Sequence, residues 1–378
     1  MDKNLTKDVP RYFQPYVNDC FHNAYGAVLQ YMGLNPAIIL ADYLSFMYDR
    51  ETGNIGVNYF YGPNTSVEFK EENLNTSLEF AYLPATALYS QTVENFREIK
   101  SIDRVNINMY ICDNPEEAYS RLKLLIDSGK PVVAAVDLYH MRYHRAYMKE
   151  HGLHCTVITG YNEQEGWFEL FDKYLSSSSN FDGRLPISEV NEGRASENPI
   201  TWSDGKLKRP VRHLWMEIYA HKDFRVSEEK LWNVIKESCS RMTGEKKVLG
   251  YECGVKALDC FISDLLMKKE EGLRAGDMEW FRYYLNINFR NLARNRTRFQ
   301  VFLKEIEGMF PENLIPELCN YLEDASKHWD ISANISLKLG IKGTLDLIGD
   351  MVKHLIVVQN LETCLVDKLE EYLLINKV

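Results

Sequence analysis

The sequence predicts an α+β domain followed by an all-α domain, on two observations. Before about residue 222, short runs rich in β-branched and aromatic residues alternate with Gly, Pro, Asn and Asp, which is typical of strands mixed with helices. After that point, apolar residues recur three, four and seven positions apart in nearly every window, which is the pattern of amphipathic helices. We therefore expect an α+β domain over residues 1–222 and an all-α helical domain over residues 223–378.

Several elements follow from this pattern. In the first domain the strands are expected at 131–139, 153–161, 167–172 and 211–220. The polar segment 176–199 is long, and we assign it no regular structure. In the second domain the clearest helices are expected at 227–242 and 362–375, with Ser227, Glu229 and Lys230 marking the start of the first.

The composition describes an ordered globular protein and excludes several other classes. A net charge of -10 argues against nucleic-acid binding, which depends on clustered Lys and Arg. The first residues contain no apolar signal region, and no stretch approaches the roughly 18 apolar residues of a membrane span, so we expect a cytoplasmic protein. Eight cysteines without a CxxC pair favour reduced thiols over a disulfide framework or a zinc ribbon.

Cys20 begins a segment that has the pattern of an amphipathic helix. Its apolar residues share one face up to Gly33, and either Asn18 or Asp19 is suited to cap the start. In the first turn of a helix, free backbone N–H groups and the macrodipole favour an anion, and thiol pKa values there reach roughly 3.5–7.5. Cys20 is therefore a candidate thiolate nucleophile.

A thiolate nucleophile needs a base, a group that orients the base, and an oxyanion donor. If Tyr161 faces Trp167 across a hairpin, residue 174 lies opposite His154, and Asp172 shares the face of His154 one diagonal away. A shift of one residue in this register would separate the two. Gln14 lies six residues before the cysteine, and its amide is suited to donate to an oxyanion.

At these residues the chain resembles a known family. The order Gln14, Cys20, His154, Asp172 is similar to that of papain-like cysteine peptidases. The stretches GKPVVAAVDLYH, HCTVITGYN and FELFDKY resemble the bacteriocin-processing branch, and most closely the butirosin biosynthesis protein H family. The resemblance departs at Phe21 and His22, where the peptidases usually have a small residue after the nucleophile.

The resemblance implies a papain-like fold and an acyltransferase. Its Cys20 would take an acyl group from a carrier-protein thioester and pass it to an amine, forming an amide in antibiotic biosynthesis. No cofactor would be bound by the chain itself, because the phosphopantetheine belongs to the partner carrier protein. The oligomeric state stays open.

Two other functions remain open for the same residues. Delivery of the acyl group to water would make the chain a cysteine peptidase or a thioesterase. Alternatively Cys20 is buried core in a catalytically inactive scaffold, since most helical cysteines with apolar neighbours are core residues. Cys155 follows His154 in its strand, so its side chain is expected on the opposite face and buried.

Two further clusters could bind ligands. His140 and His144 have the i, i+4 spacing of a helical metal pair, with Asp137 nearby, but no Glu stands between them, and we expect no metal. Tyr139 and His140 follow a strand end and are candidates to line a substrate cleft. Arg290, Arg294 and Arg298 recur every four residues and would form one cationic stripe on a helix, suited to dock an acidic carrier protein or to bind neighbouring helices.

Overall fold

A computed structural model describes residues 3–57, 102, 105–175, 179–202, 205–208, 210–248 and 250–376. They divide into two compact units. The first unit contains residues 3–40 and 105–224 of this set, and the second contains 41–57, 102 and the residues from 225 onward. Residues 41–57 thus belong with the C-terminal residues, whereas the sequence prediction placed them in the N-terminal domain.

An antiparallel sheet forms the centre of the first unit. Among the described residues it has seven strands, in the order β4-β11-β5-β6-β7-β8, with β1 paired to β6. This mixture of helices with an antiparallel sheet confirms the predicted α+β class. The strands are β1 (Lys3–Leu5), β4 (Val105–Tyr110), β5 (Val132–Asp137), β6 (Leu153–Asn162), β7 (Trp167–Leu175), β8 (Ser179–Pro186) and β11 (Trp215–Ala220). A separate hairpin pairs β9 (Pro199–Trp202) with β10 (Gly205–Lys208).

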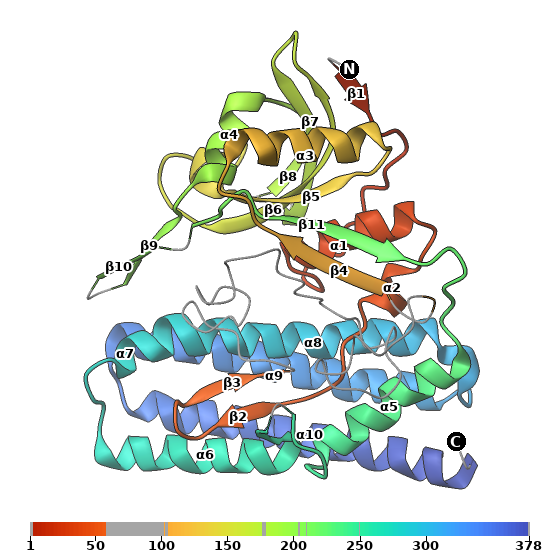
Figure 1. The fold of residues 1–378 in the computed structure, drawn as a ribbon. Helices are drawn as coiled ribbons and strands as arrows, with labels where there is room; N and C mark the ends of the chain where they lie inside the picture. The colour runs from red at the N-terminus through yellow and green to blue at the C-terminus, as the bar shows by residue number, and fades with distance from the viewer. Residues whose placement is uncertain are drawn as a thin grey trace. The chain divides into compact units, whose positions relative to one another are not determined.

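Helices pack on both faces of this sheet. α3 (Pro115–Asp127) and α4 (Ile187–Ala195) cover one face, and α1 (Cys20–Tyr31) packs on the other (Figure 1). The remaining helices of the unit are α2 (Pro36–Ile39) and the 3-10 helix η6 (Leu138–His140). α3 begins as its sequence requires, because the Asn114 side chain accepts the N–H groups of Glu116 and Glu117 and a proline follows the cap.

Residues 179–199 of the polar segment are more ordered than their sequence indicated. Strand β8 pairs with β7 along its length, and α4 follows at once, placing Val190 in the core. The strand signal was weak because β8 is the last strand of the sheet order and carries exposed polar residues and Gly183. Composition therefore predicted a loop where tertiary pairing makes a strand.

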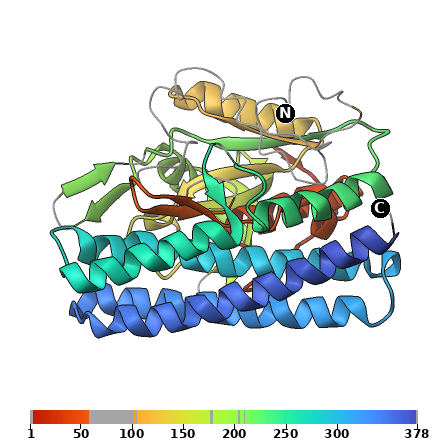
Figure 2. The same cartoon turned by 90° about the horizontal axis from the view of Figure 1, so that it is seen from below.

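The second unit is mainly helical. Long helices α8, α9 and α10 run side by side (Figure 2). Its helices are α5 (Glu228–Met242), α6 (Gly254–Glu271), α7 (Asp277–Glu279), the π-helix η7 (Trp280–Leu285), α8 (Asn286–Glu305), the 3-10 helix η8 (Glu307–Met309), α9 (Leu314–Lys342) and α10 (Asp346–Asn376). The Ser227 side chain accepts the Lys230 N–H, which confirms the predicted start of α5. The unit is not wholly helical, because β12 (Glu252–Cys253), β2 (Met47–Asp49) and β3 (Asn54–Gly56) form a small sheet.

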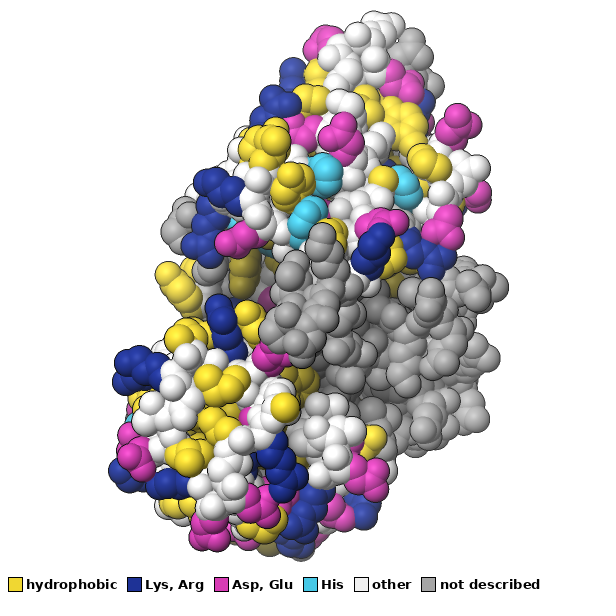
Figure 3. Space-filling model, turned by 90° about the vertical axis from the view of Figure 1, so that its left-hand side faces the viewer, with side chains coloured by type: hydrophobic (Ala, Val, Ile, Leu, Met, Phe, Trp, Pro, Cys, Tyr) yellow, Lys and Arg dark blue, Asp and Glu magenta, His cyan; other side chains and the backbone are white. Residues whose placement is uncertain are grey.

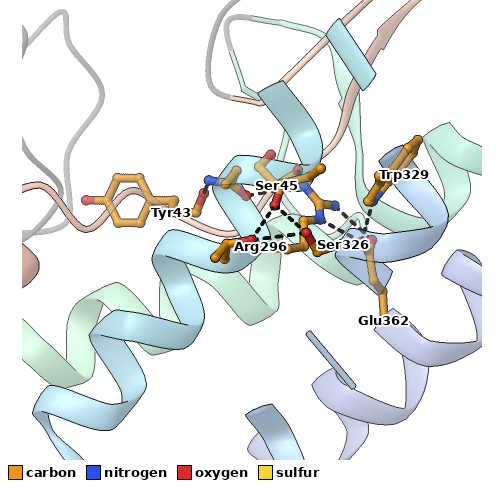
Figure 4. A network of polar contacts seen from close by, with 9 residues as sticks. Tyr43, Ser45, Arg296, Ser326, Trp329 and Glu362 are labelled. Atoms are coloured by element: carbon orange, nitrogen blue, oxygen red, sulfur yellow. Dashed lines mark hydrogen bonds and ion pairs between the residues drawn. The ribbon is translucent and has the colours of Figure 1, made fainter. Parts of the chain in front are cut away.

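A buried polar network fixes the segment around residue 45 within this unit (Figure 4). Arg296 of α8 binds Glu362 of α10 through two hydrogen bonds of 2.6 and 2.8 Å and donates to the Ser45 carbonyl at 2.8 Å. Trp329 of α9 donates to Glu362 at 3.0 Å, and Asn295 donates to the Tyr43 carbonyl at 3.2 Å. The buried charges are paired, and backbone carbonyls of a nonhelical segment are satisfied by helix side chains.

None of the helices within the described residues combines the length and apolar character that crossing a membrane requires.

Candidate functional site

The start of α1 positions Cys20 as the first helical residue. Of the two predicted caps, Asp19 takes the role: its Oδ1 accepts the backbone N–H of His22 at 2.9 Å and lies 2.8 Å from His22 Nδ1. His22 is buried and packs against the cap. The cap leaves Cys20 in the first turn, where backbone N–H groups favour an anion.

Residues 12–18 are bound to α1 at two points. The Gln14 N–H donates to Asn23 Oδ1 of α1 at 3.0 Å, and within the segment the Gln14 carbonyl accepts the Asn18 N–H at 3.2 Å. Further along the helix, Gly26 allows Tyr12 to lie against it, since a Cβ at position 26 would be 2.1 Å from Tyr12 Cδ1. The backbone of Gln14 is therefore fixed beside the helix that begins at Cys20, and its half-buried side chain remains a predicted oxyanion donor.

The hairpin that carries His154 and Asp172 has a register the sequence did not reveal. At the turn, Asn162 faces Trp167, one residue away from the expected pairing of Tyr161 with Trp167. A β-bulge between Ile158 and Gly160 then shifts the register, so that Val157 faces Phe171. Continued from there, the pairing places His154 opposite Tyr174, whose rings are 5.7 Å apart, and restores the diagonal to Asp172.

His154 and Asp172 meet in a buried hydrogen bond. His154 Nε2 lies 2.8 Å from Asp172 Oδ2, and because a carboxylate only accepts, the imidazole donates through Nε2. Tyr143 was not predicted, yet its hydroxyl donates to the same Oδ2 at 2.9 Å. Burial lowers the pKa of His154, but the charges of Asp172 and Cys20 outweigh it, and the pKa is raised well above its usual value.

Cys20 has the electrostatics of a thiolate. Its pKa is lowered to about 6, first by a hydrogen bond from the Cys155 thiol and then by the charge and hydrogen bond of His154. Burial and the Asp19 carboxylate act in the opposite direction. The pKa of Cys155 is raised, by burial first and then by the Cys20 sulfur, so Cys155 keeps its proton and donates. At neutral pH the site therefore favours a Cys20 thiolate beside a His154 imidazolium.

Cys155 is buried, as predicted, but it belongs to the surroundings of Cys20. It lies opposite Ala135 in the sheet, while His154 lies opposite Val136, so the two side chains leave β6 on different faces. The face of Cys155 is the one on which α1 packs, and a small cavity is lined by both cysteines together with Tyr12 and Asp172. The Cys155 side chain thus lies on the face opposite His154, as predicted, and this is the face that carries α1 with Cys20.

His144 is a second buried imidazole at the site. Its ring centroid lies 6.2 Å from that of His154, and its Nδ1 accepts the Ala146 N–H at 3.1 Å. Burial and the charge of His154 lower its pKa, so the ring is neutral at pH 7, with its proton on Nε2. This leaves Nε2 of His144 as a hydrogen-bond donor beside the His154–Asp172 pair.

The residues considered for a metal have other partners. Asp137 accepts hydrogen bonds from His151 at 2.7 Å, Ser196 at 2.6 Å and two backbone N–H groups, and His140 lies 3.6 Å from Glu192. The predicted helical pair of His140 and His144 is absent, because η6 ends at His140. Within the described residues, no three His, Cys, Asp or Glu side chains are arranged to hold a metal ion.

Tyr139 and His140 lie next to this cluster, on η6. Tyr139 stacks on His151 at a ring distance of 4.3 Å, and both Tyr139 and His140 are half-buried. Histidine side chains reach the surface of the first unit on the face drawn in Figure 3. Their role in lining a substrate cleft remains a prediction.

The arginine stripe is not one exposed surface. Arg298 is buried, whereas a docking surface needs an exposed side chain. Arg290 is half-buried and is held by Asn334 at 2.8 Å and Asp330 at 3.7 Å, and Arg294 is half-buried as well. The prediction of a continuous cationic stripe is therefore wrong at Arg298, and at most Arg290 and Arg294 are placed to meet a partner.

The comparison with known proteins matches the part of the chain that holds this site. Residues 19–173 match the family model described as butirosin biosynthesis protein H, N-terminal. The matched segment begins one residue before Cys20 and ends one residue after Asp172, so it includes the nucleophile candidate and the His154–Asp172 pair. No curated protein sequence matches the chain.

Proposed function

Because residues 19–173 belong to the butirosin biosynthesis protein H N-terminal family, we propose that the chain is a cysteine-dependent acyltransferase of antibiotic biosynthesis. It moves an acyl group from a carrier-protein thioester to an amine and forms an amide. The observation that carries the proposal is the Cys20 thiol at a helix start, with its pKa lowered to about 6 beside the buried His154–Asp172 pair.

The first half of the reaction forms an acyl-enzyme. The Cys20 thiolate attacks the thioester carbonyl carbon, and the carbonyl oxygen becomes an oxyanion that the Gln14 amide stabilises. The C–S bond to the phosphopantetheine sulfur then breaks, and the His154 imidazolium gives its proton to that leaving thiolate. The carrier protein departs as a free thiol, and the acyl group remains on Cys20.

The second half transfers the acyl group to the amine. The amine nitrogen attacks the acyl carbon, now-neutral His154 takes the amine proton, and the bond to Cys20 breaks to return the thiolate and release the amide. Asp172 holds His154 in one tautomer throughout and stabilises its charged form. Tyr139 and His140 line the substrate side, and Arg290 and Arg294 receive the acidic carrier protein.

A papain-like arrangement is part of the proposal. It is supported by the nucleophile at the start of a helix and by the base and its orienting group on successive antiparallel strands. The departure at Phe21 and His22 has a local explanation in the second residue, because the His22 ring and N–H both bind the cap Asp19. His22 therefore serves the helix start that holds the sulfur.

Intact-mass spectrometry with a small thioester tests the proposal. Incubation with S-acetyl-N-acetylcysteamine should add one acetyl group at Cys20, and Cys20→Ala should remove that adduct. Cys260→Ala, which changes an exposed cysteine of α6, is the matched control and should keep it. Added primary amines should convert the acetyl-enzyme to amide; release of acetate instead would assign a hydrolase, and an unreactive Cys20 would reject both.

A further inference from the structure

The Asp172 carboxylate is bound from two sides through a single oxygen. Oδ2 accepts the Tyr143 hydroxyl at 2.9 Å and the His154 Nε2–H at 2.8 Å. The Asp172 side chain is 2% exposed, so water contributes little to its solvation. The tyrosine hydroxyl is therefore a major part of the environment of this carboxylate.

The Tyr143 ring is held so that its hydroxyl has little freedom. The ring stacks on Phe181 of β8, with centroids 4.5 Å apart and planes at 14°. Its segment is fixed by Asp137, which accepts the N–H groups of Tyr139 at 3.1 Å and Gly152 at 2.9 Å at the two ends of the loop. A rigid donor of this kind orients its acceptor without a large entropic cost.

Two donors on one carboxylate oxygen compete for the same negative charge. A hydrogen bond from Tyr143 stabilises the ionised carboxylate and weakens its attraction for the proton on the His154 nitrogen. The His154 ring must give up a proton in one half of the proposed reaction and take one in the other. A proton affinity that is too high would slow the first half, and one that is too low would slow the second.

We propose that Tyr143 is a positioning residue, whose hydroxyl fixes the Asp172 carboxylate and limits how tightly the imidazolium of His154 keeps its proton. The consequence for turnover rests on the proposed acyl transfer, but the effect on His154 does not. Among the described residues, His154 interacts directly with Asp172 and Tyr174 from β7, Cys20 from α1 and His144 from the segment after β5. Tyr143, Cys155 and Asp19 reach it through these groups, Tyr143 on Asp172 and Cys155 and Asp19 on Cys20.

Histidine titration in Tyr143→Phe tests this inference. Phenylalanine keeps the stacking on Phe181 and removes one oxygen, so Asp172 binds His154 more strongly and the imidazolium becomes more stable. The protein is labelled with [13Cε1]histidine, and the His154 signal is identified by its loss in His154→Ala. We expect the His154 pKa to rise by about one unit in Tyr143→Phe.

The matched control is Tyr161→Phe, which removes another tyrosine–aspartate hydrogen bond in the same unit, from the buried Tyr161 to the exposed Asp127 at 2.7 Å. It should leave the His154 titration unchanged, although it too removes a tyrosine hydroxyl and its hydrogen bond to a carboxylate. An unchanged His154 titration in a folded Tyr143→Phe protein would overturn the inference, because a residue that only packs would affect stability alone.

A second variant protects the test from poor folding. Placing 3-fluorotyrosine at position 143 keeps the ring and makes the hydroxyl a stronger donor, so the His154 pKa should fall. A pKa that stays the same or rises would contradict the inference. None of these measurements needs an acyl substrate: a shifted His154 titration in a protein that fails to transfer acetyl groups would support Tyr143 and reject the acyltransferase.

Discussion

Each unit of this protein contains a buried pair of opposite charges, and the two pairs differ in what they can do. In the second unit, the side chains of Arg296 and Glu362 are 0% and 1% exposed. In the first unit, those of His154 and Asp172 are 4% and 2% exposed. The two pairs are therefore similarly buried, and both are hydrogen-bonded. Neither burial nor pairing by itself identifies a reactive site.

The difference lies in the remaining hydrogen-bonding groups. Arg296 cannot lose its proton at accessible pH, and its other groups bind the Ser45 carbonyl and Asn295 within the same network. The His154 imidazole can give up and regain a proton, although Asp172 and Cys20 raise its pKa, and it contacts the Cys20 sulfur as well as Asp172. A buried pair becomes chemically useful when one member exchanges protons and a nucleophile lies beside it.

Removal of Cys20 or of His154 should have the largest effect on the reactivity of the first unit. Cys20→Ala should abolish acetylation and iodoacetamide labelling at this position. His154→Ala should slow labelling at pH 7 by about 10–10²-fold, because the thiolate loses its counter-ion and its pKa rises toward that of a free thiol. Wild-type labelling should be half-maximal near pH 6 and fall tenfold per unit below it, since only the thiolate reacts. Rapid labelling of His154→Ala at pH 7 would mean that the helix start and the Cys155 hydrogen bond activate the sulfur without His154.

Breaking the pair in the second unit should give the largest loss of stability. Arg296→Met leaves Glu362 buried without its partner and should lower the free energy of unfolding by about 3–5 kcal/mol. Urea denaturation measures this, and Arg290→Met, at a half-buried ion pair on the same helix, should cost less than about 1 kcal/mol. The double variant Arg296→Met with Glu362→Leu should recover part of the loss. Equal losses in Arg296→Met and Arg290→Met would show that burial adds nothing to the pair.

The sequence predicted the polar residues of the site better than it predicted how the chain brings them together. The hairpin register was wrong by one residue at the turn, and the bulge between Ile158 and Gly160 corrects it before His154. A glycine inside a strand often signals a bulge or a close backbone approach, and here a Cβ at Gly160 would lie 2.9 Å from the Asn4 carbonyl of β1. That signal was in the sequence, but its effect on register depends on the pairing of β1 with β6.

Other features depend on contacts between distant segments and had no local signal. Tyr143 comes from an irregular loop, and only the fold places it against Asp172. The segment 41–57 has no sequence property that assigns it to the second unit, where Arg296 binds the carbonyl of Ser45 across 251 positions. Arg298 fits a surface stripe by spacing alone, yet tertiary packing buries it.

Removal of the hydrogen bond from Cys155 to Cys20 should have an intermediate effect on the labelling of Cys20. It tests whether a neutral neighbour, as well as the buried charges, sets the reactivity of the sulfur. Cys155→Ala removes the largest cause of the lowered pKa, so the pKa of Cys20 should rise by about one unit. Iodoacetamide labelling at pH 5.5 should then slow by roughly tenfold, with little change at pH 9. Cys155→Ser keeps a donor and should retain most of the reactivity at low pH. Identical profiles for the alanine and serine variants would exclude a role for the hydrogen bond.

Removal of the Asp19 charge should have the smallest effect on the pKa of Cys20. The direction of that effect distinguishes the role of Asp19 as helix cap from its charge repulsion with the thiolate. Asp19 raises the pKa of Cys20, so removal of its charge should lower that pKa by a few tenths of a unit and move labelling to lower pH. Asp19→Ser keeps an acceptor for the His22 N–H and should retain the stability of α1, whereas Asp19→Ala should lose about 1 kcal/mol. Thermal unfolding and the pH dependence of labelling measure the two effects independently. A shift of labelling to higher pH in Asp19→Ser would mean that the carboxylate supports the thiolate through the helix start more than it repels it, and the proposed balance of charges around Cys20 would then be wrong.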